Sequence, residues 1–271
     1  MIRATYINHM GDDLTVVNAA RVSFGKKVEA LGYTGADGGT MRPILADDDV
    51  RLINYLAKHK HMSPFGHCFA SFHVKAPIFV ARQLVKHKFL RWNEISRRYV
   101  DDDPEFYVPE NWRERADNKK QGSGNGVVNE LQCDDTEDYA DDKAYLADYW
   151  ETNTSRYVED NSYSSSFAIY KELLANNICP EQARMVLPQS TMTEWYWSGS
   201  LDAFADMCIL RCKDDTQGET RGIAHQISKV MLDLFPNSWQ SLLGLTQNTI
   251  RDMTEDERQR GKEKSIANGR G

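Results

Sequence analysis

Cysteine is sparse in this sequence, and its spacing argues against two kinds of site. The five cysteines in 271 residues are odd in number, and none belongs to a Cys-x-x-Cys pair. Such a set suggests neither a disulfide framework nor a thiolate zinc site, so reduced thiols are expected. A chain of this length can bury a substantial hydrophobic core without disulfide support.

Long apolar runs are also missing, since none approaches the roughly 18 residues that cross a bilayer. The first six residues, Met1 to Tyr6, lack the basic-then-apolar order of a secretory signal. We therefore expect a soluble protein of the cytosol.

Glycine-rich phosphate-binding fingerprints are absent as well. Neither GxGxxG nor GxxxxGK followed by Ser or Thr occurs, and the glycines at 122, 124 and 126 have no predicted strand before them or helix after them. This absence excludes only that mode of nucleotide binding.

The charge that is present is distributed unevenly. Of a net charge of -7, residues 101–160 contribute -12, from 18 acidic and 6 basic residues, so the remainder carries about +5. Residues 58–98 hold nine Lys or Arg against Glu94 alone, together with five of the seven histidines. We expect an anionic ligand to bind near this basic stretch.

Hydrophobic periodicity predicts several elements. Residues 47–59 have the spacing of an amphipathic helix, residues 68–75 alternate as a half-buried strand does, and Pro77 suits the first turn of a helix that runs to Val85. Further helices are predicted over 166–176, from Pro180 to Pro188, over 201–210 and over 223–235.

One domain is expected over residues 1–250. Residues 117–145 read as an acidic, glycine-containing loop insertion, and residues 251–271 as a charged tail that frays. No internal repeat is apparent.

The most informative segment runs from Gln83 to Tyr99. On the predicted helix, Gln83, Lys86 and His87 lie at i, i+3 and i+4 and so share one face. This face offers one amide and two potential cations at a helix end.

The residues after Trp92 add a second set of polar groups. If this chain is extended, Glu94, Ser96 and Arg98 project to one side. The two sets together offer cations for a phosphate, hydroxyl and amide groups for a base edge, and a carboxylate for a sugar or a ring N–H. From composition alone, a solvated basic face is an equally good interpretation.

This segment resembles the signature of flavin-dependent thymidylate synthases, Arg-His-Arg-x-x-Ser-x-Asn-Glu-x-Ser-x-Arg-Tyr. The lead-in from His73 to Gln83 and the stretch from His61 to Phe65 are also similar to that family. The positions that match the signature are His87, Asn93, Glu94, Ser96, Arg98 and Tyr99.

Three positions depart from the signature. Lys86 and Lys88 stand where the family usually has arginine, and Arg91 where it usually has serine. Lysine keeps the positive charge but lacks the planar fork of donors, so a bidentate contact becomes a point-charge contact. Arg91 argues against a nucleophilic role for its position.

The resemblance continues in the second half of the chain. The segment from Pro180 to Pro188 is similar to the one that carries a nucleotide-binding arginine, which implies this role for Arg184. Ile209-Leu210-Arg211 matches the position of the arginine that faces the pyrimidine, which implies that Arg211 is the catalytic activator. Where the family commonly has flavin-contacting Asn-Ala-Arg and a later Asn, this chain has Ser200, Leu201, Asp202 and Asp206.

The resemblance implies an α+β fold with a mixed or antiparallel sheet, a homotetramer, and methylation of dUMP to dTMP with 5,10-methylenetetrahydrofolate, FAD and NADPH. It implies no metal, and it places His61 near the active site. The implied dUMP contacts are Gln83, Lys86, Glu94, Ser96, Arg98, Arg184 and Arg211. The implied FAD contacts are Ser63, Lys86, His87, Lys88, Glu94 and Ser200.

Two strategies can activate C5 of uracil, namely addition of a thiolate to C6 or polarisation of the ring with a flavin reductant. A nucleophilic cysteine needs cations or a helix N-terminus to lower its pKa. Cys68 lies in a strand pattern and Cys208 and Cys212 flank Arg211 on a helix, which favours packing roles for them. Arg211 can stabilise negative charge on the pyrimidine.

Two other interpretations compete with this one. A metal hydrolase is suggested by the close histidines His59, His61, His67 and His73, but no HExxH pattern or set of acidic partners accompanies them. A single-strand- or nucleotide-binding module without catalysis is suggested by the basic segment with Phe89, Trp92 and Tyr99 for stacking. A pI of about 5.5 favours one small phosphorylated ligand over a polyanion.

Overall fold

The computed structural model describes residues 1–35, 41–100, 102–117, 123–124, 126–131 and 153–244. These form two compact units: the first comprises Met1–Ile7, Ser71–Ser198 and Leu210–Ile227, and the second draws on Asn8–Ala70, Gly199–Ile209 and the residues from Ser228. Each unit is described by itself. The expected single domain over 1–250 stays a prediction, and the predicted tail and most of the predicted insertion lie outside the described residues.

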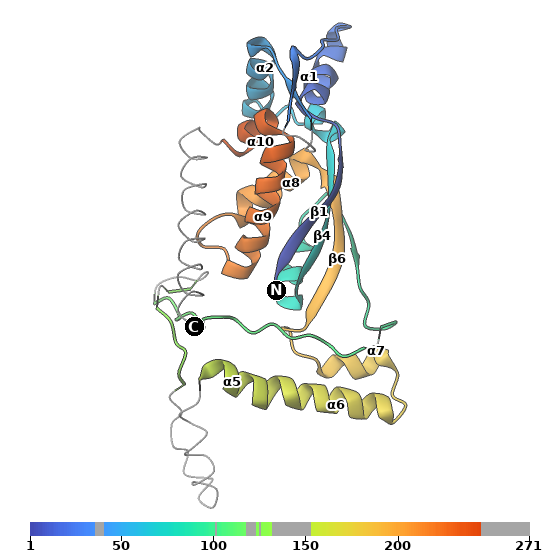
Figure 1. Ribbon diagram of the computed structural model, residues 1–271, viewed down its shortest axis with the longest axis vertical. Helices are drawn as coiled ribbons and strands as arrows, with labels where there is room; N and C mark the ends of the chain where they lie inside the picture. Colours follow the sequence, from blue (N-terminus) through green and yellow to red (C-terminus); the bar gives the residue numbers. More distant parts are fainter. Residues whose placement is uncertain (36–40, 101, 118–122, 125, 132–152, 245–271) are drawn as a thin grey trace, which may run out of the picture. The chain divides into compact units, whose positions relative to one another are not determined.

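A four-stranded sheet supplies the framework of the first unit, with strand order β1-β4-β6-β5. Figure 1 shows β1, β4 and β6 side by side. The strand bounds are Arg3–Met10 for β1, Phe69–Pro77 for β4, Leu90–Glu94 for β5 and Met192–Ser200 for β6.

Side-chain pairs show that β4 and β6 run antiparallel. The Ser198 hydroxyl donates to that of Ser71 at 2.9 Å, and His73 Nε2 lies 3.0 Å from a carboxylate oxygen of Glu194. Residue numbers therefore rise along β4 as they fall along β6, which is the order of an antiparallel pair.

Burial alternates along β4, as the sequence predicts. Ala70, Phe72, Val74 and Ala76 are buried, whereas the residues between them are not. The predicted strand at 68–75 is thus confirmed. Pro77 ends this strand and lies just before the helix α3 (Ile78–Leu84), so it is the N-cap of α3 rather than part of its first turn.

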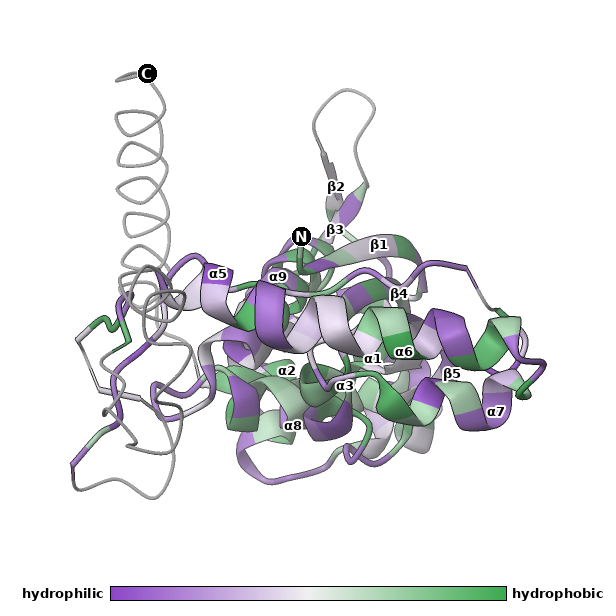
Figure 2. Ribbon diagram, turned by 90° about the horizontal axis from the view of Figure 1, so that it is seen from below, coloured by the Kyte–Doolittle hydropathy of each residue, from purple (hydrophilic) through white to green (hydrophobic). Residues whose placement is uncertain are grey.

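Several helices of the first unit precede β6 in the chain. Figure 1 shows α5 and α6 as one continuous rod, and in Figure 2 both polar and apolar residues appear along α6. The helix predicted at 166–176 is confirmed by α6. The bounds are Thr154–Val158 for α5, Glu159–Tyr163 for the π-helical turn η3, Ser164–Ala175 for α6, Pro180–Ala183 for α7 and Arg184–Val186 for the 3-10 turn η4.

The second unit is mainly helical. The predicted helix at 47–59 is confirmed by α2, whose buried residues include Ile53 and Leu56. A short antiparallel pair, β2 with β3, lies in the same unit. The bounds are Asp13–Arg21 for α1, Val22–Phe24 for η1, Gly32–Thr34 for β2, Arg42–Ile44 for β3, Asp47–Lys58 for α2, Ser63–His67 for η2 and Pro236–Leu243 for α10.

A buried carboxylate joins α1 to α10 within the second unit. Asp13 accepts from the backbone N–H of Asn237 at 2.8 Å, from its side-chain amide at 2.9 Å, and from the backbone N–H of Ser238 at 3.0 Å. These backbone donors are in the first turn of α10, where N–H groups have no partner inside the helix. Asp13 therefore caps α10 from the opposite end of the sequence.

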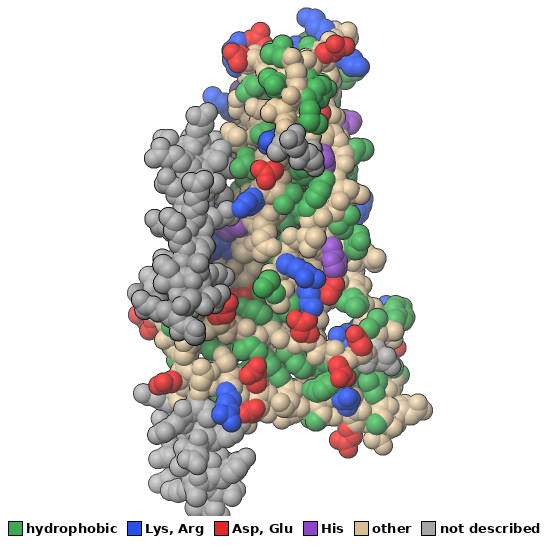
Figure 3. Space-filling model, in the orientation of Figure 1, with side chains coloured by type: hydrophobic (Ala, Val, Ile, Leu, Met, Phe, Trp, Pro, Cys, Tyr) green, Lys and Arg blue, Asp and Glu red, His purple; other side chains and the backbone are tan. Residues whose placement is uncertain are grey.

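Two further helices, α8 (Leu201–Arg211) and α9 (Gly218–Leu234), confirm the helices predicted at 201–210 and 223–235. Together the sheet and the helices confirm the predicted α+β class. No helix of the described residues is long and apolar enough to cross a membrane. On the face shown in Figure 3, basic and acidic side chains both appear among apolar ones.

Candidate functional site

The basic segment forms a turn between α3 and β5 in the first unit. Because α3 ends at Leu84, Lys86 and His87 follow the helix instead of lying on it. Phe89 has a φ of +63°, in the left-handed region, and this reverses the chain into β5. The prediction that Gln83, Lys86 and His87 share one helix face is therefore wrong, although the structure still brings these residues together.

Arg211, at the end of α8, is held against this turn by two acceptors. Its Nε donates to Nε2 of His87 at 3.0 Å, and its Nη2 donates to the backbone carbonyl of Gln83 at 3.1 Å. Both contacts use one edge of the guanidinium. The planar group is thus fixed in orientation, with further donors left for a ligand.

Burial and charge set the protonation of this pair. Burial, and then the Arg211 cation, lower the pKa of His87 to about 4. His87 is therefore neutral at pH 7, and the hydrogen bond at its Nε2 requires the proton to be on Nδ1. Burial also lowers the pKa of Arg211, but an arginine remains protonated in this range.

A cavity of about 380 Å³ lies beside Arg211. We call it the Arg211 cavity. Besides Arg211, two residues predicted to contact dUMP line it, namely Gln83 and Lys86. The other lining residues are Leu210, Lys213, Asp215, Thr216 and Gln217.

The sequence did not single out the residues after α8 that line this cavity. Gln217 accepts from the side-chain amide of Gln83 at 2.5 Å, and Thr216 donates to the carbonyl of Leu210 at 3.3 Å. These residues belong to an aperiodic connection between two helices. Only the tertiary arrangement, which places that connection next to α3, reveals them.

Glu94 ends β5 and is held by two neighbours. Its Oε1 accepts from the hydroxyl of Thr193 at 2.7 Å and its Oε2 from the indole N–H of Trp92 at 3.0 Å. Trp92 stacks on Trp195 with ring centroids 4.3 Å apart. The carboxylate predicted to contact dUMP and FAD is thus fixed by the sheet beneath it.

Ser96 and Arg98 follow β5 in a turn, because the N–H of Tyr99 donates to the carbonyl of Ser96 at 2.9 Å. The condition that the chain after Trp92 is extended is therefore not met at residues 97–99, which form this turn. Within the turn, Arg98 Nε donates to the Ser96 hydroxyl at 3.3 Å. The turn, and not the alternation of side chains along a strand, brings Ser96 and Arg98 together.

Arg98 and Arg184 share a neighbour on α7. Arg98 lies 3.9 Å from a carboxylate oxygen of Glu181, and Arg184 Nε donates to the backbone carbonyl of Glu181 at 3.3 Å. Two of the arginines predicted to contact dUMP thus meet at one helix. Their contacts here are largely exposed, so both side chains can reorient toward an anion.

Lys86 and Lys88 are exposed and have no ion-pair partner among the residues that the structure describes. An ammonium group without a carboxylate partner is free to bind a phosphate. Both lysines flank His87 in the turn. The turn therefore presents one cation on each side of a neutral imidazole.

Three predicted residues lie in the second unit. His61 is exposed and stacks on Tyr55, with ring centroids 6.1 Å apart. Ser63 is exposed at the start of η2, and Ser200 is buried at the end of β6. The structure describes their surroundings only within that unit.

Asp202 and Asp206 also lie in the second unit, one turn apart on α8. A buried side-chain oxygen of Asp202, Oδ1, has no hydrogen-bond partner among the described residues. Burial, followed by the nearby Asp202, raises the pKa of Asp206. Lys60, which also lies nearby, acts in the opposite direction and lowers this pKa.

Two of the cysteines, Cys68 and Cys208, have surroundings typical of packing. Cys68 is fully buried, and burial raises the pKa of its thiol to about 12. Cys208 is buried as well. A thiol at that pKa is not ionised at neutral pH, so Cys68 is not an activated nucleophile. Among the described residues, no group of three His, Cys, Asp or Glu side chains could hold a metal ion.

Comparison with known proteins identifies the family. Residues 5–237 match the family model described as thymidylate synthase complementing protein. A flavin-dependent thymidylate synthase from Thermus thermophilus is 36% identical over 233 residues, which are 86% of this chain and 72% of that protein. One from Thermosipho africanus is 32% identical over 88% of this chain and 89% of its own length.

A solved structure of a nucleotide methylase is also similar to this chain. The UMP/dUMP methylase PolB from Streptomyces cacaoi, bound with 5-Br dUMP, aligns with a TM-score of 0.67 and 26% identity, over 90% of this chain and 95% of that chain. Since the family model covers most of the chain and two relatives exceed 30% identity over most of their length, the chain belongs to the family of flavin-dependent thymidylate synthases.

Proposed function

We propose that this chain methylates dUMP to dTMP, with FAD as its bound cofactor, 5,10-methylenetetrahydrofolate as the one-carbon donor and NADPH as the reductant. Family membership and the likeness to a dUMP methylase support this reaction. A binding module without catalysis is not favoured, because the relatives are named as enzymes.

One observation carries the proposal, namely the fixed guanidinium of Arg211 at a cavity. C5 of uracil is a poor nucleophile, and electron density must reach it before it can attack a one-carbon unit. A cation held by His87 and Gln83 is preorganised to stabilise negative charge on the pyrimidine ring. Arg211 is therefore the proposed catalytic residue.

The remaining dUMP contacts divide by chemistry. Lys86, Arg98 and Arg184 supply cations for the phosphate, and Gln83 supplies an amide at the Arg211 cavity. Glu94 and Ser96 offer a carboxylate and a hydroxyl to the nucleoside. Substrate bound in this way is oriented by groups that the sheet and α3 hold in place.

The residues of the basic turn fit a flavin dinucleotide. Lys86 and Lys88 can hold its pyrophosphate, and His87, neutral at pH 7, can lie against the cofactor without an added charge. Glu94, Ser63 and Ser200 are the other proposed FAD contacts, and His61 is proposed to lie near the active site. When bound, FAD supplies the hydride that reduces the transferred one-carbon unit.

The proposed assembly is a homotetramer in the cytoplasm, with no metal or nucleic-acid partner. Light scattering on the purified, FAD-loaded protein tests the assembly. A mass of one or two chains would contradict it.

The test of the activity is release of tritium from dUMP labelled at C5, with FAD, 5,10-methylenetetrahydrofolate and NADPH present. We expect tritium release together with dTMP, because methylation replaces the hydrogen at C5. We also expect NADPH to bleach the flavin faster when dUMP is present. If dUMP binds but no tritium is released, the chain is a binding module.

A further inference from the structure

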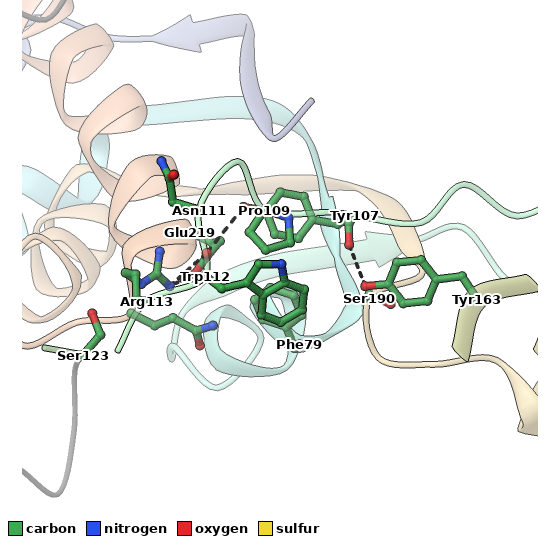
Figure 4. A pocket seen from close by; sticks show the side chains of 11 residues that line it. Phe79, Tyr107, Pro109, Asn111, Trp112, Arg113, Ser123, Tyr163, Ser190 and Glu219 are labelled. Atoms are coloured by element: carbon green, nitrogen blue, oxygen red, sulfur yellow. Dashed lines mark hydrogen bonds and ion pairs between the residues drawn. The ribbon is translucent and has the colours of Figure 1, made fainter. Parts of the chain in front are cut away.

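A second cavity in the first unit lies outside the proposed dUMP and FAD contacts. Its volume is about 500 Å³, and its walls include four aromatic side chains, Phe79, Tyr107, Trp112 and Tyr163. Figure 4 shows these side chains with the polar residues of the same cavity. We call it the aromatic pocket. Walls of this kind favour a flat, apolar ring.

The polar side of the aromatic pocket is an ion pair. Arg113 Nη2 donates to both carboxylate oxygens of Glu219, at 2.9 and 2.7 Å. Burial opposes ionisation of Glu219, but the hydrogen bonds from Arg113, from its own backbone N–H and from Gln217, together with the charge of Arg113, outweigh burial and lower the pKa of Glu219. Burial, and then Glu219, raise the pKa of Tyr107 to about 12, so its hydroxyl stays neutral.

Arg113 has donors that this pair does not use. Among the described residues, none accepts a hydrogen bond from its Nε or Nη1, and the side chain is 37% exposed. Gly218 makes room for that group, because a Cβ atom there would lie 3.0 Å from Nη1. The ion pair thus occupies Nη2 and leaves the donors of Nε and Nη1 to bind an anion.

The aromatic pocket adjoins the Arg211 cavity. Gln217 lines both, and its side chain accepts from Gln83 of the Arg211 cavity. A molecule seated in the aromatic pocket can therefore extend past Gln217 toward the reacting groups.

We propose that the aromatic pocket binds a planar aromatic group bearing an acidic substituent, the part of a co-substrate that does not react. The ring lies among Phe79, Tyr107, Trp112 and Tyr163, and the acid accepts from a donor of Arg113 that Glu219 does not use, Nε or Nη1. This rests on the proposed function, in which two co-substrates carry such a part. One is the aminobenzoyl-glutamate of the folate, and the other is the phosphorylated adenosine of NADPH.

Fragments that lack the reacting rings test this site directly. We would titrate the full-length, FAD-loaded protein with p-aminobenzoyl-glutamate and with adenosine 2′-monophosphate by calorimetry, each with and without saturating dUMP. We expect one fragment to bind and dUMP not to displace it. The fragment that binds identifies the co-substrate.

Two variants and one control locate the binding. Arg113→Lys keeps the charge opposite Glu219 but removes the Nε and Nη1 donors, and should weaken fragment binding about tenfold. Trp112→Ala removes an aromatic wall and should weaken it at least as much, provided that circular dichroism shows a folded protein. Arg115→Lys changes an exposed arginine of the same segment outside the pocket and should leave binding unchanged.

Three results would overturn the proposal: no binding of either fragment, unchanged binding to Arg113→Lys, or competitive displacement by dUMP. Formation of dTMP, measured on the same preparation, separates this proposal from the proposed function. Active enzyme that binds neither fragment refutes the pocket alone. Fragment binding without dTMP formation refutes the activity alone.

Discussion

Arg211 and His87 form a pair in which one side chain orients the other. Nε of the guanidinium donates to the neutral imidazole nitrogen of His87, and its Nη2 donates to the backbone carbonyl of Gln83. Both acceptors come from the segment that joins α3 to β5. The pair therefore ties the end of α8 to the basic turn within the first unit.

Replacing Arg211 should separate catalysis from folding. Arg211→Ala should remain a folded, FAD-binding protein and lose about 100-fold or more in kcat, because a preorganised charge is typically worth that much. Tritium release and the flavin spectrum measure the two properties. Arg211→Lys keeps a cation but lacks the planar set of donors, so its kcat should lie between those of the unchanged protein and Arg211→Ala. Normal turnover in Arg211→Ala would refute the catalytic role of Arg211.

His87 makes stability depend on pH in a defined direction. Its folded pKa of about 4 lies below the ordinary value of 6.5, so between these values the unfolded chain binds more protons. Stability from this residue is present above pH 6.5 and is lost as the pH falls toward 4. The urea concentration at the midpoint of unfolding should decrease as the pH is lowered from 6.5 to 4. His87→Gln, which cannot titrate, should make this midpoint depend less on pH. An equally steep fall in that variant would assign the effect to other groups.

The sequence predicted residue types at the site better than their contacts. Gln83, Lys86 and Arg211 were expected to bind one ligand, and all three line one cavity. The Arg211–His87 hydrogen bond was not predicted, because it joins residues 124 positions apart. Likewise, Thr193 and Gln217 have no local signal, and their roles depend on which strands and helices are neighbours.

At the scale of elements, periodic segments were predicted well and their ends less well. The helix α2 and the strand β4 follow from spacing alone, since each buries one face. The helix α3 stops earlier than its apolar pattern suggests, because Leu84 is followed by a turn whose Phe89 reverses the chain. Such a reversal depends on where the next strand pairs, which a sequence pattern does not contain.

The contact between Asp13 and α10 should contribute measurably to stability. Asp13→Ala leaves the donors of Asn237 and Ser238 without partners in a buried place, which should cost about 1–3 kcal/mol. Asp13→Asn keeps one acceptor oxygen and should cost less. Denaturant unfolding measures both.

The exposed Asp48 is the matched control for this prediction. It pairs with Arg51 on the surface of α2, and Asp48→Ala should change stability by less than about 1 kcal/mol. A loss in Asp13→Ala no larger than in this control would show that the cap contributes little.

At the scale of the whole molecule, an acidic protein must bind an anionic substrate. The net charge is -7, yet the predicted phosphate contacts are cations of the first unit. Attraction between these cations and the phosphate acts locally and is screened by salt over about 10 Å at 0.1 M. The uneven distribution of charge along the sequence, and not the net charge, predicts this anionic ligand.

Salt should therefore weaken substrate binding. Raising the salt concentration from about 50 to 300 mM should increase the KM for dUMP several-fold and leave kcat nearly unchanged, because screening acts on the charged contacts. Inhibition by uncharged deoxyuridine is the control and should not change. A KM independent of salt would show that the phosphate is not bound by exposed cations.

The cap on α10 also bears on how the protein is made. Asp13 and Asn237 are separated by 224 positions, and residues 71–198, which belong to the other unit, are synthesised between them. During translation, α1 leaves the ribosome long before α10 exists. The second unit can therefore complete its fold only after α10 has been synthesised, and until then its helices α1 and α2 are candidates for chaperone binding.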